Sequence, residues 1–254
     1  IRLTQASGSV APDLRPVLGA TPEDLDDDLL KSRFAGLRGF DFETLGHDQR
    51  LAILTDAEIL HPQTGGPTIA GLLCFGHNPS RRLPYAVVSC VVYPGVSVTH
   101  ELRDRAELDG RVDRQIVNGL AFLERALPSA SDVRGARRIE RPRYRAEGLR
   151  EVIANAVVHR HYGIAGPIQV RVFADRIEVT SPGAPPNGVT PQAMRIGVSV
   201  RRNQFLMQRL NELGLVDAVG RGVVLLYDEA AELGLPEPLV TVHDTWTTVT
   251  LSLV

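Results

Sequence analysis

The sequence lacks several features that would assign a protein to a class at once. It has two cysteines, Cys74 and Cys90, in 254 residues, and neither has a second thiol or a histidine at metal-ligand spacing. We therefore expect buried, reduced thiols and no disulfide framework. No apolar run reaches the length of a membrane span, no signal peptide opens the chain, and no Walker A pattern occurs. We expect a cytoplasmic protein without a membrane partner.

The sequence also has no large excess of positive or negative charge. The 28 basic and 30 acidic side chains give a net charge of −2, so no global field draws the chain onto nucleic acid. Arginines do gather locally, at Arg134, Arg137, Arg138, Arg141, Arg143 and Arg145. Two interpretations of this cluster stay open, a solvated linker and direct contact with DNA, and the near-neutral total disfavours the second.

The length allows two modest domains. We predict an irregular lead-in over 1–20, a smaller α/β domain over 21–133, an arginine-rich linker over 134–145 and a second domain over 146–254. The chain starts with Ile and not with Met, so we expect a domain upstream of it in the full-length protein.

The first half shows mostly short patterns. Thr21-Pro22-Glu23-Asp24 is typical of a helix start, and the acidic run over 24–28 fits a solvated helix start better than a metal site. Beyond it we predict a helix over 48–59, two buried strands that neighbour each other in one sheet over 68–76 and 85–93, and a long amphipathic helix over 108–127.

The most informative segment is EGLREVIANAVVHRHY, residues 147–162. One helical face of it is apolar, with Leu149, Val152, Ile153, Ala156 and Val157. Glu151, Asn155 and His159 are spaced four apart and form a polar stripe on the other side. A carboxylate and a carboxamide one turn apart offer hard oxygen ligands for Mg²⁺. The alternative is a polar stripe that faces solvent.

Glycine-containing loops follow this helix. Residues 168–173 and 176–180 alternate across a tight Ala174-Asp175 turn, which predicts a β-hairpin. The hairpin leads into the loop 181–188, where Gly183 lets the backbone approach a ligand closely. Gly220 and Gly222 open a further helix, whose first amides suit phosphate. A plain helix-start turn explains these two glycines equally well.

The order of these segments resembles the GHKL superfamily of gyrase, heat-shock chaperone ATPases, histidine kinases and MutL. The segment from Leu149 to His159 resembles the helix called the N-box, and Ile177-Glu178-Val179-x-x-Pro182-Gly183 stands where the superfamily has its Asp-x-Gly loop. Gly220-Arg221-Gly222-Val223 resembles the second glycine box, and 247–253 the terminal strand.

One branch, the RecG-related transcriptional regulators, is more similar still. It shares Asn155-Ala156-Val157-Val158-His159-Arg160, the Pro-Gly loop, Arg202-Asn203 and a segment matched by Thr68 to Pro79. Members commonly carry an upstream AlbA-like (Schlafen-type) nucleic-acid-binding domain. The resemblance therefore implies that DNA is bound only through a domain upstream of this chain.

The sequence departs from the superfamily at the position that recognises adenine, where Ser181 replaces an aspartate. A serine offers no charged acceptor, so adenine affinity should be weaker by about 1–3 kcal/mol. His161 replaces the acidic residue usual in the branch. Arg202 and Asn203 either reach a phosphate or merely start the helix over 205–213.

Together these patterns predict an α+β protein whose C-terminal part is a Bergerat-type α/β sandwich, with helices on one face of a mixed sheet, preceded by a smaller α/β domain. The resemblance implies a regulator fragment that binds ATP or a related nucleotide with Mg²⁺, with at most weak ATPase activity, and that forms a homodimer. Glu151 is the candidate catalytic residue and Asn155 the metal ligand. The other candidate binding residues are His159, Ser181, Gly183, Arg202, Asn203, Gly220 and Gly222. The alternative is a non-hydrolysing module that dimerises or senses a ligand for an attached DNA-binding domain.

Overall fold

The structure is a computed structural model that describes residues 11–35, 42–127, 131–134, 137–140, 144–198, 200–217 and 222–254. Its α-helices are α1 (Asp27–Phe34), α2 (His47–Asp56), α3 (Ile69–Phe75), α4 (Val112–Ala126), α5 (Ala146–His159), α6 (Pro191–Arg195), α7 (Gln204–Glu212) and α8 (Gly222–Glu232). Its strands are β1 (Val88–Val92), β2 (Asp104–Leu108), β3 (Ser131–Arg134), β4 (Arg137–Glu140), β5 (Ile168–Val172), β6 (Arg176–Pro182), β7 (Leu239–Val242) and β8 (Trp246–Ser252).

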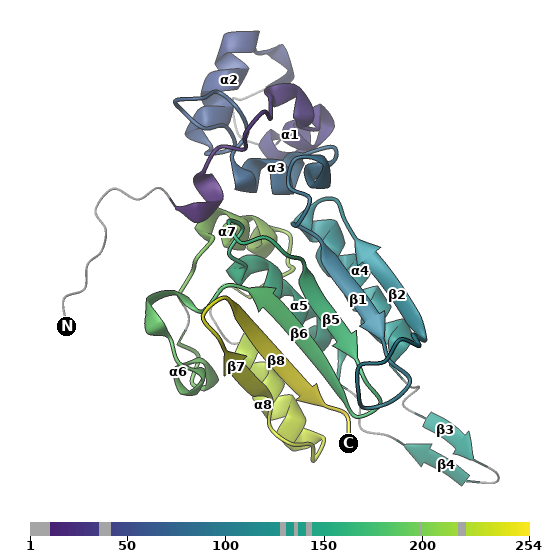
Figure 1. The fold of residues 1–254 in the computed structure, drawn as a ribbon. Coiled ribbons are helices and arrows are strands. Elements are labelled where there is room, and N and C mark those ends of the chain that lie inside the picture. Colours follow the sequence, from purple (N-terminus) through teal and green to yellow (C-terminus); the bar gives the residue numbers. More distant parts are fainter. Residues whose placement is uncertain are drawn as a thin grey trace.

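A six-stranded mixed sheet forms the centre of the fold (Figure 1). Its strand order is β2-β1-β5-β6-β8-β7, and only β1 and β5 run parallel to each other. Helices α4, α5 and α8 cover one face (Figure 1), and the buried apolar residues of β1, β5 and β6 belong to the same core as those of α4 and α5. In β5, for example, Ile168, Val170 and Val172 are buried and the residues between them are half-buried. The predicted α+β architecture, with helices on one face of a mixed sheet, is confirmed.

Helix α5 is the central element of the helical layer. It contacts α4, α8 and β6. The five apolar residues predicted to share one face are all buried, namely Leu149, Val152, Ile153, Ala156 and Val157. The hairpin predicted over 168–180 is also present, with Val172 paired with Ile177 across the turn.

The prediction of a strand over 68–76 is wrong, because this segment is helix α3. The Thr68 side chain accepts a hydrogen bond from the backbone N–H of Gly71 (2.9 Å) and so caps the helix. All seven residues of α3 are buried, and a run that is apolar on every side carries no periodicity that distinguishes helix from strand. The neighbours of β1 in the sheet are consequently β2 and β5.

The segments around α4 also differ from the predictions. The amphipathic helix begins at Val112 and not at Leu108. Leu108 is the last residue of β2, a strand that was not predicted. Part of the predicted linker over 134–145 is a β-hairpin, in which Arg134 pairs with Arg137. Of the six arginines of the cluster, Arg134, Arg137 and Arg138 belong to this hairpin and Arg145 directly precedes α5, whereas Arg141 and Arg143 lie outside the described residues.

The predicted division of the chain into domains stays a prediction. Strands β1 and β2 come from the segment 21–133, and the other four strands of the sheet come from 146–254. The two segments therefore share one sheet, and α4 packs directly against α5.

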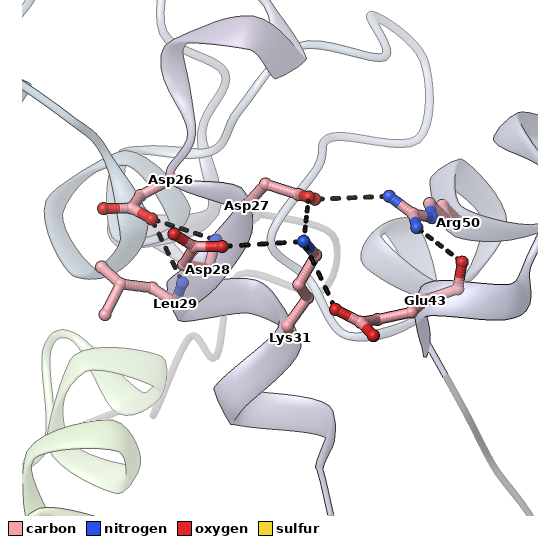
Figure 2. A network of polar contacts seen from close by, with 7 residues as sticks. All are labelled: Asp26, Asp27, Asp28, Leu29, Lys31, Glu43 and Arg50. Atoms are coloured by element: carbon pink, nitrogen blue, oxygen red, sulfur yellow. Dashed lines mark hydrogen bonds and ion pairs between the residues drawn. The ribbon is translucent and has the colours of Figure 1, made fainter.

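A cluster of short helices, α1 to α3, lies beyond one end of the sheet (Figure 1). The predicted helix start at Thr21-Pro22-Glu23-Asp24 is present as the short 3₁₀ turn η2 (Pro22–Asp24), with Thr21 at its N-cap position. The acidic run then continues into α1, as predicted, and Asp26 caps that helix. Its Oδ1 accepts from the backbone N–H groups of Asp28 (3.1 Å) and Leu29 (3.2 Å), as Figure 2 shows. In the same view Lys31 lies within 3.1 Å of an Asp27 oxygen. These carboxylates thus cap the start of α1 and form ion pairs on its surface.

Across the ranges that the structure describes, every helix is too short or too polar to cross a membrane.

Two glycines in helices provide a matched test of the packing. A methyl group at Gly71 would lie 2.2 Å from the carbonyl oxygen of Ile59, whereas at Gly119 it would lie 3.1 Å from Cδ1 of the Ile153 side chain. Both substitutions gain about 1 kcal/mol of helix propensity. We expect Gly71→Ala to lower the free energy of unfolding by about 1–3 kcal/mol and Gly119→Ala to leave it equal or higher, as measured by urea unfolding. Equal effects at the two sites would contradict the described packing of α3.

Candidate functional site

A cleft opens beside α5, between the end of β6, the segment that carries α6, and the first turns of α8. Of the nine residues predicted for a site, six line this cleft: Glu151, Asn155, His159, Ser181, Gly183 and Gly222. Arg202 and Asn203 lie behind its rim, and Gly220 falls outside the described residues. The polar stripe of α5 therefore faces the glycine-containing segments and not open solvent.

Glu151 and Asn155 form the polar centre of the cleft. The Asn155 Nδ2 donates to Glu151 Oε1 over 2.8 Å, the contact expected one helical turn apart. This bond fixes the orientation of the amide. Its oxygen, Oδ1, is turned away from Glu151 and makes no hydrogen bond among the described residues. The pair thus offers the Glu151 carboxylate and, on the far side of the Asn155 amide, a carbonyl oxygen.

The close contact between Glu151 and the start of α8 requires a glycine at position 222. A Cβ at this position would lie 1.6 Å from Glu151 Oε1, so the backbone at the start of α8 lies directly against the carboxylate. The amino-terminal end of a helix carries partial positive charge, which favours a carboxylate there. Gly148 of α5 packs in the same way against the Glu229 carboxylate of α8. The two helices therefore fit together through two glycine–carboxylate contacts.

Burial shifts the acidity of both titratable groups of the stripe. The Glu151 side chain is 8% exposed, and burial raises its pKa, with the hydrogen bond from Asn155 acting in the opposite direction and nearby Asp217 adding to the rise. Burial together with the Arg202 guanidinium lowers the pKa of His159 to about 4. His159 is therefore neutral at pH 7.

Ser181 occupies the base-recognition position implied by the resemblance. It is buried, and its Oγ donates to the carbonyl oxygen of Ala156 over 2.7 Å. The hydroxyl proton is therefore used within the protein, and the oxygen keeps lone pairs that can accept a further hydrogen bond. Ser181 thus serves as a neutral acceptor in the cleft.

Gly183 adopts a φ of +111°, which favours glycine, and the Arg202 guanidinium lies directly against it. Arg202 donates to the carbonyl oxygens of His159 (2.9 Å) and Ala184. Asn203 donates to those of Val158 and Arg160, each over 2.7 Å. Both side chains are thus bound to backbone carbonyl oxygens, and the two interpretations of Arg202-Asn203, phosphate contact and helix start, stay predictions.

Several residues of the cleft were not predicted from the sequence. Asp217 lines it and lies near enough to Glu151 to affect its pKa, and Met194, Met207 and Tyr227 belong to its apolar lining. The chain has two methionines and both are here. Methionine side chains adapt to irregular partners, so this wall can adjust to a ligand. A signal for Asp217 existed, since it closely precedes the glycine pair.

The sheet, the helical layer on one of its faces and the cleft beside α5 form an α/β sandwich. Residues 166–251 match the sequence model of the family HATPase_c_4, described as "Putative ATP-dependent DNA helicase recG C-terminal". The predicted resemblance to the RecG-related branch is thus confirmed over this segment, which includes Ser181, Gly183 and Gly222 but begins after α5.

A solved structure shares the fold. The DIP2311 protein from Corynebacterium diphtheriae superposes with a TM-score of 0.67 at 23% sequence identity, over 98% of this chain and 49% of that protein. The present chain therefore spans about half the length of that relative. No curated protein shows a significant sequence match.

The raised pKa of Glu151 gives a prediction for the protein without metal. A carboxyl whose pKa is higher in the folded state than its ordinary value of 4.5 destabilises the fold as the pH rises above that value. We expect Glu151→Gln, which keeps the acceptor for Asn155, to raise the free energy of unfolding at pH 8. The gain should vanish as the pH falls towards 4.5, as measured by urea unfolding in EDTA.

The exposed Glu107 of β2 provides the control, and Glu107→Gln should leave the free energy of unfolding unchanged. A Glu151→Gln protein that is less stable than the wild type at pH 8 would show that the fold stabilises the ionised carboxylate and would contradict this account of the cleft.

Proposed function

We propose that this chain is a nucleotide-binding module that binds ATP or a related nucleotide together with Mg²⁺ in the cleft beside α5. The observation that carries the proposal is the convergence of Glu151, Asn155, Gly183 and Gly222 on one cleft. These residues come from three separate segments of the chain. Their meeting supports a ligand site more strongly than any one of the motifs does.

The donor set fits Mg²⁺. The ion prefers hard oxygen ligands and is commonly held by one or two protein groups in addition to phosphates and water. Asn155 Oδ1 would hold it, with Glu151 beside it. When bound, the ion neutralises phosphate charge.

Glu151 is suited to orient a water molecule or accept its proton. A raised pKa brings a carboxyl closer to the operating pH of a general base. Its oxygen Oε1 is held by Asn155 and packed against Gly222, so the carboxylate has little freedom to move. We infer at most slow hydrolysis.

A second candidate function is ligand sensing without hydrolysis, on behalf of an attached DNA-binding domain and in a homodimer. Ser181 favours it, because its neutral hydroxyl replaces a charged acceptor and its proton is already bound to Ala156 O. In this case DNA would be contacted by a domain outside this chain.

The nucleotide proposal is tested by thermal and chemical unfolding with Mg-ATP, Mg-ADP and Mg-GTP. A ligand at a hundredfold excess over its Kd should stabilise the wild type by about 2.7 kcal/mol. Asn155→Ala should abolish the part of this stabilisation that depends on Mg²⁺, because it removes the amide oxygen. The matched control is Gln169→Ala in β5, whose side chain is half-buried and does not line the cleft. No stabilisation by any nucleotide would favour the sensing module.

Ser181→Asp tests base recognition. The carboxylate would add a charged acceptor for an adenine amino group, so we expect the affinity for Mg-ATP to rise about tenfold. Guanine presents a carbonyl oxygen at the corresponding position, so the affinity for Mg-GTP should not rise. Calorimetric titration measures both. An equal gain for the two nucleotides would place the base elsewhere.

A further inference from the structure

The cap of helix α7 comes from the far end of the chain. Asp13, in the short 3₁₀ turn η1 (Pro12–Leu14), is fully buried. Its Oδ2 accepts from the backbone N–H groups of Phe205 (3.1 Å) and Leu206 (3.4 Å), in the first turn of α7. These groups have no partner within the helix, and a carboxylate is a preferred acceptor for them.

The local residue that would normally cap α7 is used elsewhere. Asn203 occupies the N-cap position and belongs to a residue type that caps well, yet its side chain makes no capping bond. Its Nδ2 donates instead to the carbonyl oxygens of Val158 and Arg160. These two oxygens belong to the end of α5. Asp13 thus satisfies α7 while Asn203 is bound to α5.

The residues at the start of α7 hold the rim of the cleft. Arg202 connects His159 O, at the end of α5, to Ala184 O in the Pro-Gly loop. Two backbone bonds complete this rim, from His161 N–H to Pro182 O and from Gly183 N–H to Thr245 O, each 2.7 Å long. Met207, in the first turn of α7, lines the cleft itself.

We propose that Asp13 is a positioning residue for the cleft. By capping α7 it keeps Arg202 and Asn203 where they bind the end of α5 and the Pro-Gly loop, although it touches neither loop nor ligand. The amino-terminal part of the chain is thereby connected to the cleft. The expected effect of Asp13 on ligand affinity rests on the proposed function. Its expected effect on the hydrogen bonds of the rim does not.

The test compares two helix caps that have the same number of backbone donors. Asp13→Ala removes the cap of α7, and Asp26→Ala removes the cap of α1 (Figure 2), which lies outside this chain of contacts. The readout is amide hydrogen exchange, measured residue by residue by NMR. We expect Asp13→Ala to speed exchange of the His161 and Gly183 amides by about fivefold or more, and Asp26→Ala to leave both at the wild-type rate.

Variants that restore an acceptor at position 13 distinguish a positioning role of Asp13 from general destabilisation of the fold. Asp13→Asn keeps an acceptor for the same amides and should restore wild-type exchange at the rim. Asp13→Ser, with a shorter acceptor, should give an intermediate rate and serves if Asp13→Ala does not fold. Faster exchange at Phe205 and Leu206 with unchanged His161 and Gly183 would overturn the proposal.

The second part of the test is a titration with Mg-ATP, which measures the affinity of each variant for the nucleotide. Asp13→Ala should weaken binding about fivefold, and Asp13→Asn and Asp26→Ala should stay within about twofold of the wild type. A wild-type protein that binds no nucleotide would end the proposed function, and the exchange comparison would still decide the role of Asp13. Binding unchanged by Asp13→Ala would refute the effect on affinity.

Discussion

Helix α5 is enclosed by the sheet, α4 and α8, and the rest of the structure depends on this enclosure (Figure 1). Its apolar face is buried in the core, so the remaining stripe faces the cleft. Glu151 is left in a site where burial opposes its charge. The fold tolerates this carboxylate because Asn155 donates to it and the start of α8 lies against it. A destabilising group at the centre of a cleft is a common property of functional sites.

The sequence predicted the elements whose patterns are local. The stripe of α5 follows from helical spacing, and the β5–β6 hairpin follows from alternation around a tight turn. Segments without such a pattern were missed or wrongly assigned. Helix α3 is buried on every side, and β2, with the sequence DRAEL, lies at the edge of the sheet, where charged side chains are normal. In both cases the tertiary environment, and not the local pattern, determines the conformation.

The same distinction applies to the site. Gly183 and Gly222, which line the cleft, were predicted from the residue types typical of loops and helix starts, and Ser181 was predicted from the resemblance to the superfamily. The parts that depend on long-range contacts were not predictable. Asn203 has the sequence of an ordinary helix cap, and only the structure shows that its amide binds the end of α5 while Asp13 supplies the cap. No spacing rule connects residues 192 positions apart.

The charge of the cleft explains why the proposed ligand would need a metal ion. The described part of its lining contains the carboxylates of Glu151 and Asp217 but no lysine or arginine, and His159 is neutral at pH 7 because its pKa is about 4. Arg202 lies close by, but its guanidinium is bound to backbone carbonyls. A phosphate entering alone would therefore meet mostly negative charge. Asn155 suits such a site because an amide supplies a metal-binding oxygen without adding a third negative charge.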